Sequence, residues 1–163
     1  MIVVSNTSPL TNLAAIGKLS VLEALYGEVH VPAAVWNELT DSRFTWPGQA
    51  SVVASDWIRR DSVASEPLVT VLRRDLDAGE AEAIALAMAM RADLVLLDER
   101  EARRSAERLG LARVGVLGVL LEAKRARLLE QIEPSLRALR EVAGFYLSEP
   151  LCDAVLRLAG ELE

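Results

Sequence analysis

The segment Leu94–Leu97 is the strongest constraint on the fold, because four consecutive Leu and Val residues are followed at once by the acid Asp98. A run of this length is too short for a buried helix, and it predicts a strand that is covered on both faces. Asp98 then lies just past the carboxyl end of that strand. Ligands bind at this edge in open α/β sheets, so we expect Asp98 to belong to a functional site.

Strand-like and helix-like segments alternate along most of the chain. Short apolar runs predict strands at residues 2–5, 29–31, 94–97 and 113–116, and Trp57-Ile58 predicts either a further short strand or packing over the core. Helical patterns fall at residues 19–25, 32–39, 66–74, 77–91 and 99–109 and in three C-terminal stretches, with a first helix capped by Ser8 and opened by Pro9. Residues 41–50 predict a loop. This alternation is typical of βαβ units around a mainly parallel sheet.

The composition favours one α/β domain over residues 1–163. The chain is 52% hydrophobic but only 4% aromatic, which suits aliphatic helices packed on a sheet. The last predicted helix has a stripe of Leu147, Leu151, Val155 and Leu158, so we expect the C-terminal helices, at about residues 130–163, to pack on the domain or to form a homodimer interface. We expect no membrane segment and no signal peptide, and the single cysteine, Cys152, favours a reducing cytoplasm.

Two acids occur on helix faces that otherwise look like core. Glu38 follows Ala34 and Val35 on one face of its helix, where it is either a metal ligand or a solvated residue at the rim of the core. Glu80 projects from a helix that is apolar nearly all round. It also fits a capping box with Asp77 as the N-cap, and in that case Glu82 is the free acid. Spacing alone leaves both possibilities open.

Polar residues also follow the first and the fourth predicted strands. Asn6 and Ser8 offer oxygen atoms without charge and equally form a capping cluster. Asp98 either caps the next helix or binds a ligand, and Glu101 is a possible outer partner or a favourable charge near a helix N-terminus. A set of hard oxygen donors with no Cys/His cluster favours Mg²⁺ or Mn²⁺. The chain has no glycine-rich phosphate loop, so we expect no nucleotide cofactor, and its single histidine, His30, has no nucleophile beside it.

Basic residues gather in one part of an acidic chain. Between Arg100 and Arg127 there are eight basic residues and three acids, although the net charge of the whole chain is −6. This segment is either a pair of solvated helix faces or a phosphate-binding surface. For the second case we expect Arg100, Arg103 and Arg104 to contact phosphates.

Taken together, these motifs resemble the PIN-domain superfamily of metal-dependent ribonucleases, and in particular a prokaryotic subgroup of PIN-like proteins that neighbours the VapC-type toxins. The resemblance covers roughly residues 1–130. Its strongest parts are the segments VVSNTSPL at 3–10, VP at 31–32 through EL at 38–39, LDAGEAEAIALA at 76–87 and ADLVLLDER at 92–100.

The resemblance implies a three-layer α/β/α sandwich with acids from distant segments around one or two Mg²⁺ or Mn²⁺ ions. Carried over position by position, the metal-binding and catalytic residues are Asn6, Glu38, Glu80 and Asp98, with Glu82 and Glu101 as weaker candidates and Thr7 or Ser8 supplying a hydroxyl to the substrate. The family usually has Asp at the position of Asn6, and the loss of one charge weakens the hold on a cation.

The expected function is that of a metal-dependent endoribonuclease, the toxin of a toxin–antitoxin pair, with RNA and a small antitoxin as partners. The alternative is a non-catalytic PIN-like module that binds RNA or protein, in which Asn6 marks an attenuated site. A phosphatase of similar layout is disfavoured, because Asn6 cannot replace the nucleophilic Asp that such an enzyme needs after its first strand.

Overall fold

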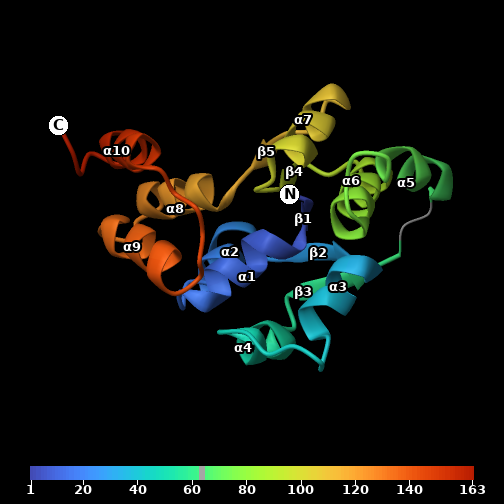
Figure 1. Ribbon diagram of the computed structural model, residues 1–163, viewed down its shortest axis with the longest axis horizontal. Helices are drawn as coiled ribbons and strands as arrows, with labels where there is room; N and C mark the ends of the chain where they lie inside the picture. The colour runs from blue at the N-terminus through green and yellow to red at the C-terminus, as the bar shows by residue number, and fades with distance from the viewer. Residues whose placement is uncertain (63–64) are drawn as a thin grey trace.

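The centre of the molecule is a parallel sheet of five strands, seen in a computed structural model that describes residues 1–62 and 65–163 (Figure 1). Within those residues the strand order is β3-β2-β1-β4-β5, and all pairs are parallel. The strands are β1 (Val3–Ser5), β2 (Val29–Pro32), β3 (Ile58–Asp61), β4 (Leu94–Leu96) and β5 (Arg113–Val114). The predicted α/β class with a parallel sheet is therefore confirmed.

Helices connect the strands and form the C-terminal third of the chain. They are α1 (Thr7–Ala15), α2 (Ser20–Tyr26), α3 (Ala33–Thr40), α4 (Gln49–Ala54), α5 (Glu66–Leu72), α6 (Ala78–Met90), α7 (Arg100–Arg108), α8 (Val116–Arg125), α9 (Glu133–Glu141) and α10 (Glu149–Leu158). No helix in the described ranges is long and apolar enough to cross a membrane.

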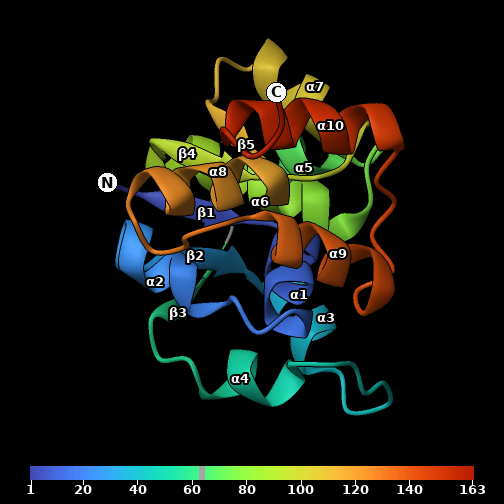
Figure 2. The ribbon, with the colours of Figure 1, turned by 90° about the vertical axis from the view of Figure 1, so that its left-hand side faces the viewer.

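The sheet lies between two layers of helices, because side chains of successive strand residues point to opposite faces. Val3 and Leu96 belong to a core cluster with α1, α2, α8 and α9, whereas Val4 and Val95 belong to a second cluster with α6 and α7. Figures 1 and 2 show these two groups of helices on either side of the strands. The three-layer α/β/α arrangement follows directly.

The strand order creates a switch point between β1 and β4. The chain leaves β1 toward β2 on one side, and it later returns to place β4 on the other side of β1. Ser5 pairs with Leu96 in the register, and the backbone N–H of Asn6 donates to the carbonyl of Leu96 at 3.1 Å. The residues that follow β1 and β4 therefore emerge side by side, at the place where open α/β sheets bind ligands.

Several element boundaries differ from the prediction. Helix α1 begins at Thr7 with Asn6 as its N-cap, two residues before Pro9, because the hydroxyl of Ser8 bonds to Asp98 instead of capping the helix. Pro32 is the N-cap of α3, not its first helical residue. The predicted loop at 41–50 ends at Gly48, the N-cap of α4, which begins at Gln49. Spacing did not reveal this short helix of six residues.

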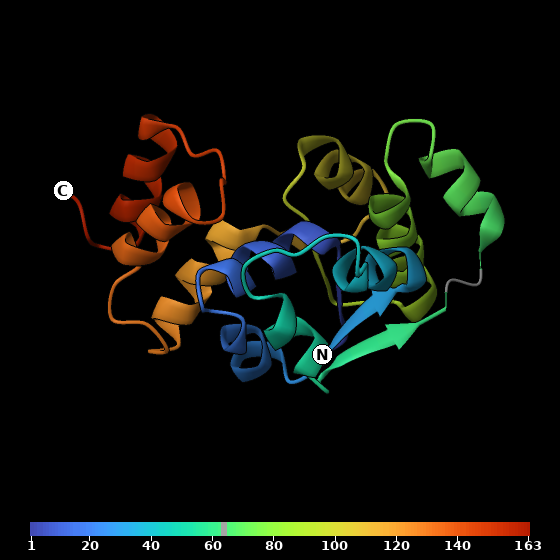
Figure 3. The ribbon, with the colours of Figure 1, turned by 60° about the horizontal axis from the view of Figure 1, so that its bottom comes forward.

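The C-terminal helices pack beside α8 at one end of the molecule (Figure 3). Leu136 and Leu139 of α9 and Val155 of α10 are buried in the same core cluster as α1 and α8. The predicted stripe on the last helix is divided: Leu147 and Val155 are buried, whereas Leu151 and Leu158 are 44% and 68% exposed. The exposed pair leaves part of α10 uncovered by the chain itself.

Candidate functional site

A hollow of about 410 Å³ opens at the carboxyl end of β1, and we call it the acidic pocket. Its lining comes from the start of α1, the end of α3, the start of α6 and the N-cap of α7, and consists of Asn6, Thr7, Ser8, Thr11, Glu38, Asp77, Glu80 and Glu99. Four of these residues are acids, and in the part of the chain that the structure describes no basic side chain lines the pocket. The pocket therefore attracts cations and repels a phosphate that arrives without one.

Asn6 and Glu38 bring oxygen atoms together over the backbone of Gly79. A Cβ built on Gly79 lies 3.0 Å from Oδ1 of Asn6 and 3.0 Å from Oε1 of Glu38. Asn6 is only 5% exposed, and its place as N-cap immediately after β1 fixes its backbone. Thr7 Oγ1 donates to the other carboxylate oxygen of Glu38 at 2.8 Å, which orients that exposed side chain. Because Gly79 has no side chain, the two oxygens can converge on one point.

Glu80 is part of a capping box and also lines the acidic pocket. The N–H of Glu80 donates to Asp77 Oδ1 at 2.8 Å, and the N–H of Asp77 donates to Glu80 Oε2 at 3.2 Å, which completes a capping box. The side chain still lines the acidic pocket and is 8% exposed. Glu82 points elsewhere: it accepts from the N–H of Ala34 at 3.3 Å and lines a different hollow.

The surroundings of Glu80 disfavour its charge. Burial raises the pKa of Glu80 above its ordinary value, and the carboxylate of Asp77 raises it further. Glu99 and Glu38 act in the same direction, and the hydrogen bond from the Asp77 N–H only partly opposes them. A bound cation would relieve this repulsion.

Asp98 lies beside the acidic pocket but does not line it. Its carboxylate accepts from the N–H of Val116 at 2.7 Å, from Ser8 Oγ at 3.0 Å and from Asn12 Nδ2 at 3.5 Å. Burial raises the pKa of Asp98 above its ordinary value, and these hydrogen bonds only partly oppose that effect. Asp98 thus joins the end of β4 to α1 and α8.

Glu99, Asp77 and Thr11 line the acidic pocket although they were not predicted as site residues. Glu99 is the N-cap of α7 and makes no side-chain capping bond. The available signal was its position, one residue after Asp98 at the same sheet edge. Asp77 was visible only as the cap of α6, and nothing in the local pattern singled out Thr11.

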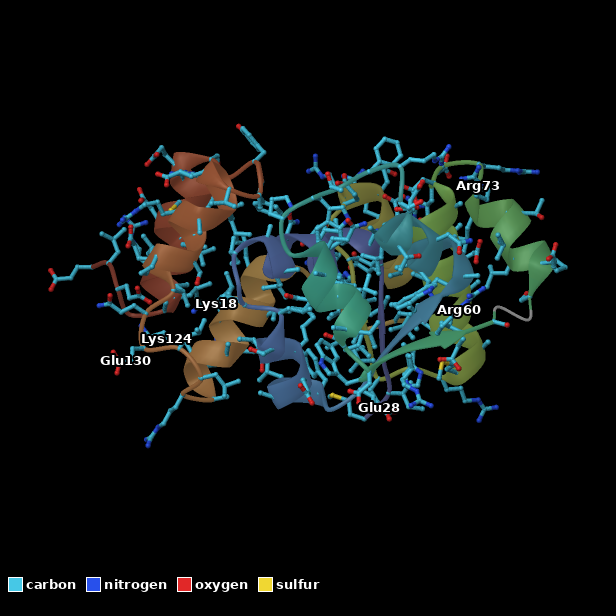
Figure 4. The ribbon with its side chains drawn as sticks, turned by 90° about the horizontal axis from the view of Figure 1, so that it is seen from below. Lys18, Glu28, Arg60, Arg73, Lys124 and Glu130 are labelled. Carbon is cyan, nitrogen blue, oxygen red and sulfur yellow. The ribbon has the colours of Figure 1, made fainter. Side chains whose placement is uncertain are left out.

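The predicted basic contacts are divided among different environments. Arg103 donates to the carbonyl of Leu97 at 3.2 Å and faces Asp98, so it supports the end of β4. Arg104 pairs with Glu101 at 3.3 Å on the exposed face of α7. Arg100 is exposed at the first turn of that helix. Figure 4 shows other basic residues spread over the molecule, with Lys18 and Lys124 at one end and Arg60 and Arg73 at the other.

The donor set of the acidic pocket fits a hard divalent cation. Across residues 1–62 and 65–163 no three His, Cys, Asp or Glu side chains converge closely enough to form a complete metal cage. Mg²⁺ does not need such a cage, because it keeps several waters and binds through one or two carboxylates. The converging oxygens of Asn6 and Glu38, with Glu80 and Glu99 on the same pocket wall, match that requirement.

The protein is a three-layer α/β protein with an acidic pocket at the switch point of its parallel sheet. The chain belongs to the PIN-domain family: the family model DUF3368, described as a PIN domain, matches residues 2–161. Comparison with curated proteins gives no match. The family resemblance that the sequence motifs carry is therefore confirmed over nearly the whole chain.

Proposed function

We propose that this protein is a metal-dependent endoribonuclease. The observation that carries the proposal is the convergence of Asn6 and Glu38 oxygens over Gly79 in a pocket whose other acids are Asp77, Glu80 and Glu99. Bound Mg²⁺ or Mn²⁺ supplies an activated water and stabilises the leaving oxygen of a phosphodiester. PIN-type nucleases act on RNA in the same way, which makes RNA the proposed substrate.

Each residue of the pocket has a distinct part in this proposal. Asn6 and Glu38 would hold the cation, and the hydroxyl of Thr7 keeps the Glu38 carboxylate in place. Glu80 and Glu99 complete the negative wall of the pocket, and either carboxylate would serve as a proton acceptor for the attacking water. Asp98 is the positioning residue that fixes the chain next to Glu99, through its bonds to Ser8 and Val116.

The test is cleavage of a mixed RNA pool by the purified chain with Mn²⁺, Mg²⁺ or EDTA. Glu38→Gln and Glu99→Gln should each lower the metal-dependent rate by at least about 100-fold, the size of a lost catalytic proton transfer or charge contact. Glu101→Gln is the matched control, since Glu101 pairs with Arg104 on the exposed face of α7. Metal-independent cleavage, or full activity in both pocket variants, would refute the proposal.

The second candidate is a non-catalytic PIN-like module, which Asn6 itself favours. An amide at this position provides an oxygen but no charge. The pocket therefore holds a cation less tightly than it would with an aspartate at position 6. This candidate predicts RNA or protein binding that is the same with metal and with EDTA. Mn²⁺-dependent turnover by the wild-type chain would rule it out.

We further propose that the nuclease is the toxin of a toxin–antitoxin pair in the cytoplasm, where a small antitoxin covers the acidic pocket. Cys152 as the single cysteine fits a reducing compartment. The exposed Leu151 and Leu158 of α10 are the proposed contact for a second copy of the chain. Arrest of growth on expression, which Glu38→Gln should abolish, tests the toxin role, and the mass in solution of wild type and Leu158→Glu tests the dimer.

A further inference from the structure

A second hollow adjoins the acidic pocket and has a different chemistry. It has a volume of about 290 Å³, and we call it the aromatic hollow; Asn12, Trp46, Pro47 and Val142 are among its lining residues. Thr11 lines both this hollow and the acidic pocket. A polymer whose backbone crosses the acidic pocket can therefore place a neighbouring group in the aromatic hollow.

The loop that carries Trp46 packs against α1 and bonds to the end of α3. Gly48 has a φ of 87°, and a Cβ at this position would collide with the backbone of Ala14. Gln49 Nε2 donates to the carbonyl of Leu39 at 3.2 Å, and the N–H of Gln49 donates to the carbonyl of Trp46 at 3.2 Å. The side chain of Trp46 is partly buried against the core cluster, so the indole has a support before any ligand arrives, which lowers the entropic cost of binding.

The same loop presents further groups that suit a nucleic acid. The chain has only seven aromatic residues, and two of them, Phe44 and Trp46, lie in this eight-residue loop. Phe44 is 65% exposed, and the guanidinium of Arg43 lies 5.7 Å from the centre of its ring. Exposed rings beside an arginine are the surfaces on which unpaired bases stack.

We propose that the aromatic hollow is a nucleobase subsite: it binds one unpaired base of the RNA next to the phosphodiester in the acidic pocket. The face of the base stacks on Trp46. Asn12 Nδ2 donates to Asp98 and Thr11 Oγ1 donates to the carbonyl of Ser8, so the side-chain oxygens of Asn12 and Thr11 are the atoms that accept from the polar edge of the base. This inference rests on the proposed ribonuclease function. A base inside a duplex cannot enter the hollow, so the subsite requires an unpaired base.

The test separates binding from cleavage by measuring binding with Ca²⁺, which takes oxygen ligands and neutralises the acidic pocket but activates water far less than Mn²⁺ does. The probe is a fluorescently labelled 12-nucleotide RNA of mixed sequence, free or annealed to its complement. The wild-type chain should bind the single strand more tightly than the duplex. Trp46→Ala should weaken single-strand binding about 5- to 100-fold, which is the loss of one stacked base, and Trp46→Phe should restore most of it. Trp57→Ala, which changes a half-buried tryptophan in a separate hollow, is the matched control.

A second pair of variants avoids any risk to the core. Val142 lines the aromatic hollow and is 52% exposed, and Val53 on α4 is 53% exposed. Both changes to Glu add the same charge to the chain, but only Val142→Glu should weaken RNA binding by fivefold or more, because it places a carboxylate at the subsite.

The outcomes distinguish the subsite from the nuclease. If the wild type cleaves RNA with metal, but Trp46→Ala and Val142→Glu bind RNA as tightly as the wild type, the subsite proposal is overturned and the proposed function still stands. Equal affinity for duplex and single strand, or no RNA binding by the wild type, would also overturn it. If the wild type binds single strands through Trp46 but shows no cleavage with Mn²⁺, the subsite stands and the nuclease proposal fails.

Discussion

Asp98 accepts a 2.7 Å hydrogen bond from the backbone N–H of Val116, a residue 18 positions further along the chain. Val116 is the first residue of α8, and the N-cap Gly115 provides no side chain to satisfy that N–H. A Cβ at Gly115 would lie 2.9 Å from Asp98 Oδ1 and 2.9 Å from an Arg103 nitrogen, so any other residue here would require these two side chains to shift. The strand-end acid therefore works as the cap of a distant helix.

Asp98→Asn should consequently destabilise the fold as well as impair activity. The amide presents a donor where the carboxylate accepts from Val116, Ser8 and Asn12, and one unpaired group in this half-buried place costs about 1–3 kcal/mol. Urea unfolding measures the loss. Glu99→Gln is the control, since Glu99 is exposed and makes no capping bond: it should unfold like the wild type. Equal stability of Asp98→Asn and the wild type would contradict the capping role.

Gly79→Ala should separate metal binding from stability. Alanine favours a helix over glycine by about 1 kcal/mol, but its Cβ would stand 3.0 Å from the converging oxygens of Asn6 and Glu38. These oxygens are side-chain ends that can move by a few tenths of an ångström, so the chain should fold with a thermal midpoint within a few degrees of the wild type. Titration with Mn²⁺ followed by calorimetry should show at least about tenfold weaker binding. Undiminished Mn²⁺ affinity would show that the cation does not lie over Gly79.

The residue pattern predicted the parallel sheet but only part of the site. Short apolar runs such as Leu94–Leu96 alternate with helical segments, which is typical of βαβ units, and the three layers were implied by the family resemblance. Asn6, Glu38 and Glu80 all line the acidic pocket. The two glutamates were singled out because an acid on an apolar helix face is unusual, and Asn6 because it follows the first strand and matches the family motif. Glu99, which also lines the pocket, was not predicted, because Asp98 is the first acid after the strand. Only the three-dimensional structure shows that the carboxylate oxygens of Asp98 already accept from Val116 and Ser8.

Glu80→Gln should keep the start of α6 and lose the charge. Gln accepts from the N–H of Asp77 as Glu does in the capping box, so the helix cap survives. Because burial and neighbouring carboxylates raise the pKa of Glu80, the folded state disfavours its ionised form, and wild-type stability falls as pH rises through that pKa. In EDTA, the variant should therefore gain stability relative to the wild type between about pH 4 and pH 7. Added Mn²⁺ should stabilise the wild type more than the variant. Thermal midpoints of the two proteins, measured near pH 4 and pH 7 with EDTA and with Mn²⁺, test the pH effect and the metal effect.

Asn6→Asp should strengthen the cation site. A fifth carboxylate at the base of the acidic pocket raises the attraction for a divalent ion, and we expect Mn²⁺ to bind about tenfold more tightly, or ~1.4 kcal/mol. Without metal the added charge should lower stability, because Asn6 is buried beside Glu38 and Glu80. Calorimetry with Mn²⁺ and unfolding in EDTA test the two parts. A variant with weaker Mn²⁺ binding would mean that the amide of Asn6 has a role that a carboxylate cannot take.

Glu161 fixes the C-terminal end of the chain, and its removal should be most costly near neutral pH. Its carboxylate accepts from Lys124 Nζ at 2.8 Å and from the N–H groups of Ile132 and Glu133 at 2.9 and 3.1 Å. The side chain is 9% exposed, and an alanine would leave these donors without a partner, for a loss of about 2 kcal/mol.

The pH dependence of this contribution has a definite sign. Burial raises the pKa of Glu161, but the hydrogen bonds from Ile132, Lys124 and Glu133 outweigh it, so the pKa lies below its ordinary value of 4.5. A lowered folded pKa means that the stabilisation is complete above the unfolded pKa and is lost as the pH falls through the folded one. Urea unfolding of the wild type and Glu161→Ala should therefore differ at pH 7 and converge toward pH 3. Glu163→Gln, at the exposed last residue, should match the wild type at both, and a constant difference for Glu161→Ala across this range would show that its effect comes from packing instead of charge.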